Sequence, residues 1–198
     1  GDVRSSPALA DGRVFFASGD GNVYAVDAAS GLPAWKTPVA PHTRGSPAVA
    51  GGRVYVGDEQ GNAFCLAASD GKVIWKKSVG GYVSACPLVA PDGIFFASEQ
   101  GDAAFFAADG KLKWQRKLDV LLSGQPVATE TQLLLPTIEG LLVLRRADGK
   151  ADDAFTPPAK GGKVLSVLAY QGKLLLTTGQ ATVNRSEEHT SELQSRLH

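Results

Sequence analysis

Few side chains in this chain could do chemistry, and they lie far apart. Cys65 and Cys86 are its only two cysteines, without the C-x-x-C spacing of zinc or redox sites and too few for a disulfide framework. We expect both to be buried structural thiols. His42 has no Ser, Cys or carboxylate partner placed beside it by any motif, so we expect a solvated loop residue rather than a general base.

Acidic residues recur at one kind of turn, in Asp58-Glu59-Gln60, Glu99-Gln100 and Glu139. Their oxygens could coordinate a hard cation such as calcium. Acidic residues at hairpin tips are more often solvated turn formers, and we predict that role here. Nucleophile elbows, phosphate loops and metal-spaced His/Cys clusters are absent from the sequence. We therefore predict no catalytic, metal-binding or cofactor-binding residue in this stretch and favour a non-enzyme.

Composition limits the kind of partner. The 198 residues carry 20 Lys and Arg against 20 Asp and Glu, a formal net charge of zero. This balance gives no electrostatic case for binding nucleic acid or an anionic membrane surface. No apolar run approaches the roughly 18 residues of a membrane span, so no transmembrane segment is predicted.

Proline, glycine and tryptophan recur in four series along the chain, each at steps of 39 or 40 residues. That period is typical of a propeller blade. Short β-prone runs alternate with turn residues inside each repeat, and no amphipathic helical stretch competes. The recurring positions are Pro7, Pro47, Pro87 and Pro126; Gly21, Gly61, Gly101 and Gly140; Gly31, Gly71, Gly110 and Gly149; and Trp35, Trp75 and Trp114.

The pattern predicts an all-β fold, a β-propeller of four-stranded antiparallel blades present as a partial ring of about four and a half blades. In the first repeat we expect strands at 6–10, 13–17, 22–26 and 33–36. The fourth repeat has Phe155 where the tryptophan is expected, and the fifth stops inside its third strand. We place the propeller at 1–184, with repeats at about 3–42, 43–82, 83–121, 122–160 and 161–184.

The C-terminal residues break the pattern. The polar tract 185–195 is unrelated to the repeats and resembles a translated short-read sequencing adapter. We expect residues 185–198 to be a non-native tail and exclude them from the prediction of fold and function.

The repeat resembles a known family at the sequence level. The positions Ala25, Asp27, Gly31 and Trp35 match the A-x-D-x-x-x-G-x-x-x-W tryptophan-docking motif of PQQ-like (pyrroloquinoline-quinone) propeller repeats. The next repeats keep the glycine and tryptophan at Gly71, Trp75, Gly110 and Trp114, but have Ala67 and Ala107 at the docking aspartate position. The resemblance implies a closed ring of seven or eight blades; a partial ring has open blade edges, through which we expect self-association.

Three kinds of protein use these repeats, and the resemblance implies envelope or periplasmic localisation. We favour a non-enzymatic protein-binding scaffold, similar to an outer-membrane assembly factor of the β-barrel assembly machinery. The segment Thr43-Arg44-Gly45 is similar to an element of that factor, with Thr43 where leucine is expected. The alternative is the propeller of a quinoprotein dehydrogenase, holding PQQ and calcium through residues outside this stretch. Envelope sensor domains form the third class.

Loop lengths suggest where a partner would bind. In an up-and-down blade, the turns between second and third strands share a face with the links between blades. These links are the longer connections, at 38–45, 79–85 and 118–124. Because loops on a rigid scaffold usually carry recognition, we predict the partner surface on this face.

Overall fold

The computed structural model describes residues 2–152, 163–170, 173–178 and 183–185. The regular structure of this part of the chain consists of strands, and it contains no helix long and apolar enough to cross a membrane. The chain divides into two compact units, residues 1–117 and 118–198. Phe155 and tail residues 186–198 lie outside the described residues, whereas Arg185 ends strand β18.

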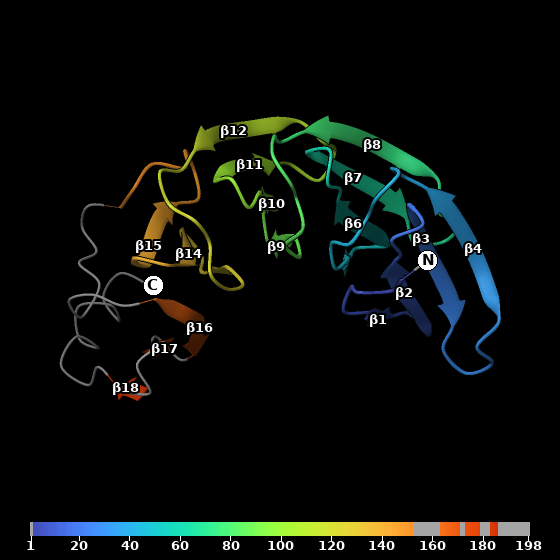
Figure 1. The fold of residues 1–198 in the computed structure, drawn as a ribbon, viewed down its shortest axis with the longest axis horizontal. Coiled ribbons are helices and arrows are strands. Elements are labelled where there is room, and N and C mark those ends of the chain that lie inside the picture. The colour runs from blue at the N-terminus through green and yellow to red at the C-terminus, as the bar shows by residue number, and fades with distance from the viewer. Residues whose placement is uncertain (1, 153–162, 171–172, 179–182, 186–198) are drawn as a thin grey trace. The chain divides into compact units, whose positions relative to one another are not determined.

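The first unit contains three antiparallel sheets of four strands, each in simple chain order (Figure 1). The predicted all-β fold with four-stranded blades is therefore confirmed. Blade one is β1 (Ala8–Ala10), β2 (Arg13–Ala17), β3 (Asn22–Asp27) and β4 (Pro33–Pro38); blade two is β5 (Ala48–Ala50), β6 (Arg53–Gly57), β7 (Asn62–Ala67) and β8 (Val73–Ser78); blade three is β9 (Leu88–Ala90), β10 (Gly93–Ala97), β11 (Asp102–Phe106) and β12 (Leu112–Lys117).

In each of the first two blades, a two-residue turn joins the first strand to the second. Asp11 and Gly12 have φ of 47° and 71° and join β1 to β2, where Ala10 pairs with Arg13. The same turn in blade two is made by Gly51 and Gly52, with φ of 56° and 70°. Positive φ at both central positions matches the right-handed twist of paired strands, so these residues favour tight hairpins.

Aromatic and aliphatic side chains fill the spaces between the blades of the first unit. Between blades two and three, Trp75 packs against Phe106 and Tyr55, with ring centroids 5.7 and 6.1 Å apart. Cys65 lies fully buried in the same cluster, and this burial raises the pKa of its thiol to about 11. Cys86, also predicted to be buried, is only half-buried, and the two cysteines form no disulfide.

The second unit contains two antiparallel sheets of three strands each. A bridge between Leu144 and Ala151 extends the first of them beyond β15. Leu134, Val143, Val167 and Leu176 belong to the apolar cluster between the two sheets. The strands are β13 (Val127–Ala128), β14 (Gln132–Thr137) and β15 (Gly140–Arg145), then β16 (Val164–Tyr170), β17 (Lys173–Thr178) and β18 (Val183–Arg185).

Candidate partner-binding face

The links between blades and the turns between second and third strands meet at one side of the first unit. We call this side the link face; it comprises the links 38–45 and 79–85 and the turns 18–22, 58–62 and 98–102. Backbone bonds join links to turns, since the Val79 amide donates to the Gly61 carbonyl (2.8 Å) and the Val83 amide to the Asp58 carbonyl (2.9 Å). The predicted neighbourhood of links and turns is therefore present.

A buried polar side chain organises each of these turns from inside. Asp58 is 1% exposed, and its Oδ1 accepts hydrogen bonds from the amides of Gln60 (2.9 Å) and Asn62 (2.7 Å). Ser98, at the same position of blade three, accepts a bond from the Asp102 amide (2.9 Å). The expectation that the acidic turn residues are solvated is thus wrong for Asp58, because its carboxylate replaces water as the acceptor for the turn's own amides.

In each link, the backbone carbonyl of one central residue accepts a hydrogen bond from an amide of the neighbouring turn. The Glu59 amide donates to the His42 carbonyl (3.4 Å), and the Glu99 amide donates to the Tyr82 carbonyl (2.9 Å). Within the second unit the same bond runs from the Ile138 amide to the Leu121 carbonyl (3.1 Å). His42, Tyr82 and Leu121 therefore occupy equivalent positions, and each side chain is exposed.

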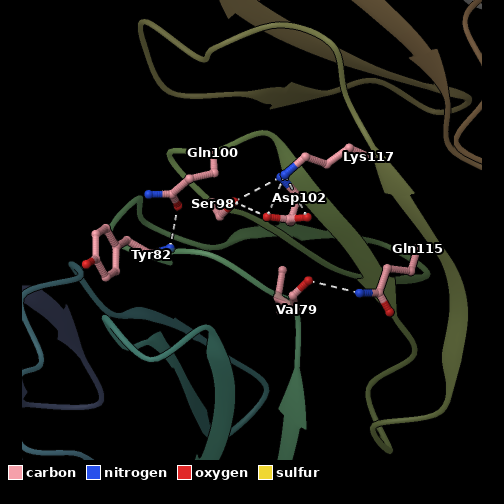
Figure 2. Close-up of polar contacts among 7 residues, drawn as sticks. All are labelled: Val79, Tyr82, Ser98, Gln100, Asp102, Gln115 and Lys117. Carbon is pink, nitrogen blue, oxygen red and sulfur yellow. Dashed lines mark hydrogen bonds and ion pairs between the residues drawn. The ribbon is translucent and has the colours of Figure 1, made fainter.

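Tyr82 is fixed more firmly than its exposure suggests (Figure 2). Its amide donates to Oε1 of Gln100 at 2.6 Å, while its side chain remains 51% exposed. Nearby, Lys117 Nζ lies 3.1 Å from Asp102 Oδ1, and Gln115 donates to the Val79 carbonyl at 2.9 Å. A large aromatic side chain is thus presented to solvent from a backbone that is held on both sides.

Charged groups surround these exposed side chains. Arg44 Nε lies 3.4 Å from Glu59 Oε1, and the Ser84 hydroxyl donates to Glu99 Oε1 at 2.5 Å. On the first turn, hydrogen bonds from the Tyr24 hydroxyl and from Asn22 hold the pKa of the Asp20 carboxyl well below its usual range. The face can offer hydrogen bonds, carboxylates and an aromatic ring to a partner.

Thr43, where the assembly-factor resemblance expects leucine, is fully buried, and its Oγ1 has no hydrogen-bond partner among the described residues. Val83 occupies the equivalent place in the next link and is equally buried. The hydroxyl of Thr43 is therefore desolvated without compensation.

Thr43→Val should stabilise the chain, by about 1 kcal/mol, because it removes an unpaired buried hydroxyl without changing the side-chain shape. Urea unfolding followed by circular dichroism measures the change. Thr37→Val is the matched control: its hydroxyl donates to the Gly71 carbonyl at 2.7 Å, so this variant should lose stability. Equal destabilisation by both changes would contradict the prediction.

The predicted tryptophan-docking residues lie on the opposite side of the first unit. Trp35 donates from Nε1 to the Ala68 carbonyl of blade two (3.0 Å), and Trp75 donates to the Ala108 carbonyl of blade three (3.1 Å). Each indole also covers a glycine of that next blade, Gly71 or Gly110. Trp114 is buried, with its ring centroid 5.7 Å from that of Phe105.

The remaining motif residues serve their own blade. Ala25 is buried and pairs with Trp35 across β3 and β4. Oδ1 of Asp27 accepts bonds from the Ser30 amide (2.8 Å) and hydroxyl (2.7 Å), which lower the pKa of this carboxyl and close the turn that contains Gly31. The indoles bond to carbonyls in the next blade rather than to an aspartate. Alanine in place of the docking aspartate at positions 67 and 107 therefore does not remove the indole acceptors, which are backbone carbonyls.

Arginines beside the tryptophans were missed by the sequence reasoning. Arg13 Nη1 donates to the carbonyls of Ala68 (2.9 Å) and Ser69 (2.8 Å), and Arg53 Nη1 donates to the Ala108 carbonyl. Each arginine opens the second strand of one blade and reaches the tryptophan corner of the next. Their recurrence at a 40-residue step was visible in the sequence, but nothing there indicated a partner in another blade.

Candidate metal ligands and the two cysteines lie apart in the described structure. Across the described ranges, no three His, Cys, Asp or Glu side chains gather closely enough to hold a metal ion. Cys65 and Cys86 belong to different blades. The two cysteines therefore do not form an adjacent pair.

Known proteins resemble this chain at two levels. The family model described as outer membrane protein assembly factor BamB matches residues 1–41 and 19–196. A search of curated proteins gave no match. Among solved structures, BamB from Moraxella catarrhalis has a TM-score of 0.72 at 17% identity, and the computationally designed Ika8 protein has a TM-score of 0.75 at 11% identity.

These comparisons cover most of this chain and about half of each solved structure. The match takes in 89% of the chain in both cases, against 55% of the Moraxella protein and 56% of the designed one. At such low identity the structural likeness shows the fold, whereas the family model spans nearly the whole chain. The chain therefore belongs to the PQQ-like β-propeller family described as outer membrane protein assembly factor BamB.

Proposed function

We propose that this chain is a non-enzymatic scaffold of the bacterial cell envelope that binds a protein partner through the link face. One observation carries the proposal: the exposed Tyr82 ring stands on a backbone fixed by Gln100 and Glu99. A pre-organised aromatic side chain loses little entropy on binding, and tyrosine and arginine dominate binding energies at protein interfaces. Arg44 lies on the same face.

The family description supports the class of partner. Because that description names an outer membrane protein assembly factor, we propose a protein subunit of the outer-membrane β-barrel assembly machinery, met on the periplasmic side. Self-association through open blade edges stays a prediction, as does the lack of a nucleic-acid partner. No observation favours the dehydrogenase alternative, and PQQ and calcium play no part in the proposal.

Tyr82→Ala should weaken capture of the purified assembly-machinery subunit by about tenfold or more, as expected for an interface anchor. Biolayer interferometry with the full chain immobilised measures the dissociation constant. Leu32→Ala is the matched control: Leu32 is 66% exposed and lies beside the tryptophan-docking turn instead of the link face. If Leu32→Ala weakened binding as much as Tyr82→Ala, the link face would not be the partner surface.

A further inference from the structure

Charge is not spread evenly over this neutral chain. The outermost strands of the first unit, β4, β8 and β12, follow one another along its outer side (Figure 1). These strands contain no Asp or Glu, but two of their lysines pair with carboxylates outside the strands: Lys113 with Asp92 (2.7 Å) and Lys117 with Asp102 (3.1 Å). The cations are Lys36, Lys76, Lys77, Lys113, Arg116 and Lys117. We call this surface the basic rim.

Aromatic rings hold several of the rim ammonium groups in place. Lys36 Nζ lies 5.3 Å from the centroid of the Tyr24 ring, and Lys76 Nζ lies 5.1 Å from that of Phe64. Cation–π contact orients a cation without neutralising its charge. Neither Lys76 nor Lys77 has a carboxylate within ion-pair distance in the described part of the chain, so their charge is available to a partner.

Exposed aliphatic side chains accompany the cations. Val73 and Ile74 open β8 and are each 46% exposed, and Leu112 opens β12 and is 48% exposed. In β8 the apolar residues are followed by Trp75 and then by Lys76 and Lys77. In β12, Arg116 and Lys117 likewise come after Trp114. Each of these outer strands thus carries exposed apolar groups and cations close together, and successive side chains point to opposite faces of the strand.

We propose that the basic rim binds the surface of an anionic phospholipid bilayer. Lysine and arginine are attracted to anionic headgroups, and apolar side chains beside them can enter the boundary between headgroups and acyl chains. Nucleic acid or an acidic polypeptide would use the cations and leave the aliphatic groups without a role. The sequence-based expectation against such a membrane surface considered only the net charge, and folding places the cations together.

Flotation of the full chain with vesicles tests the proposal. Binding is expected to vesicles of phosphatidylethanolamine and phosphatidylglycerol, to be at least tenfold weaker to phosphatidylcholine vesicles, and to fall steeply with added salt. Lys76→Glu/Lys77→Glu should weaken binding to the anionic vesicles by at least tenfold, because the change replaces two lysines attracted to anionic headgroups with two repelled carboxylates. Circular dichroism checks that the variant remains folded.

The control makes an equal change in charge elsewhere. Arg4→Glu/Lys150→Glu alters two exposed cations outside the outer strands and should retain vesicle binding. Equal loss in both double variants would overturn the proposal, as would binding that ignores lipid charge. Binding to polyglutamate or DNA without binding to vesicles would also overturn it. The vesicle test does not depend on the link face. Tyr82→Ala changes no residue of the basic rim, so this variant should still bind anionic vesicles.

Discussion

Trp75→Ala should lower the free energy of unfolding by about 3–5 kcal/mol, the range for a buried large aromatic side chain. The indole is 7% exposed, donates to the Ala108 carbonyl, and packs with Tyr55, Phe96 and Phe106 between blades two and three. Its removal creates a cavity and also leaves that carbonyl without the indole donor. Urea unfolding of the full chain, followed by far-ultraviolet circular dichroism, measures the loss.

Trp35→Ala is the matched comparison for this variant. Trp35 makes the equivalent bond to Ala68 but remains partly exposed, so its removal should cost less. A loss below about 1 kcal/mol for Trp75→Ala would mean that the contact between these blades does not depend on the indole.

Gly110→Ala should cost about 2–5 kcal/mol, the second largest effect expected in this chain. Gly110 has φ +84°, and a Cβ there would lie 2.7 Å from Cγ of Trp75. Left-handed backbone costs a residue with a Cβ about 1–2 kcal/mol, and forcing an atom into a packed site adds about 1–3 kcal/mol. Thermal and urea unfolding of the full chain measure the sum.

Gly31→Ala separates these two costs. Gly31 has φ +72°, but a Cβ there meets no atom within 4 Å in the described structure. This variant should show the backbone cost alone. Equal losses at Gly31 and Gly110 would contradict the steric argument, because only Gly110 lies under an indole ring.

The sequence predicted the fold well because its markers are local. Prolines, glycines and tryptophans at a constant step define the blades, and hairpin turns such as Asp11-Gly12 form from neighbouring residues. The partners of Arg13 and Trp35 were not predictable in the same way. They lie more than thirty residues away, on the next blade, and which carbonyl they reach depends on how two sheets pack.

For the candidate site, the sequence predicted which face of the blades it occupies but not which residues form it. Loop length identified the links, but the exposed ring of Tyr82 and the buried carboxylate of Asp58 depend on three-dimensional packing. Both residues lie in connections rich in polar residues, so the sequence does not show which of the two side chains is exposed and which is buried. Net charge was a poor guide to the basic rim, because an average over the chain says nothing about where β8 and β12 place their lysines.

Chemical labelling of the buried Cys65 thiol can report when blades two and three separate. Alkylating reagents attack thiolates, and this thiol, with a pKa of about 11 and no exposed surface, stays protonated and inaccessible at neutral pH. Labelling of Cys65 therefore requires that blades two and three part. When closing outpaces alkylation, the labelling rate gives the equilibrium population of that opened state, so mass spectrometry can follow local opening without an added probe.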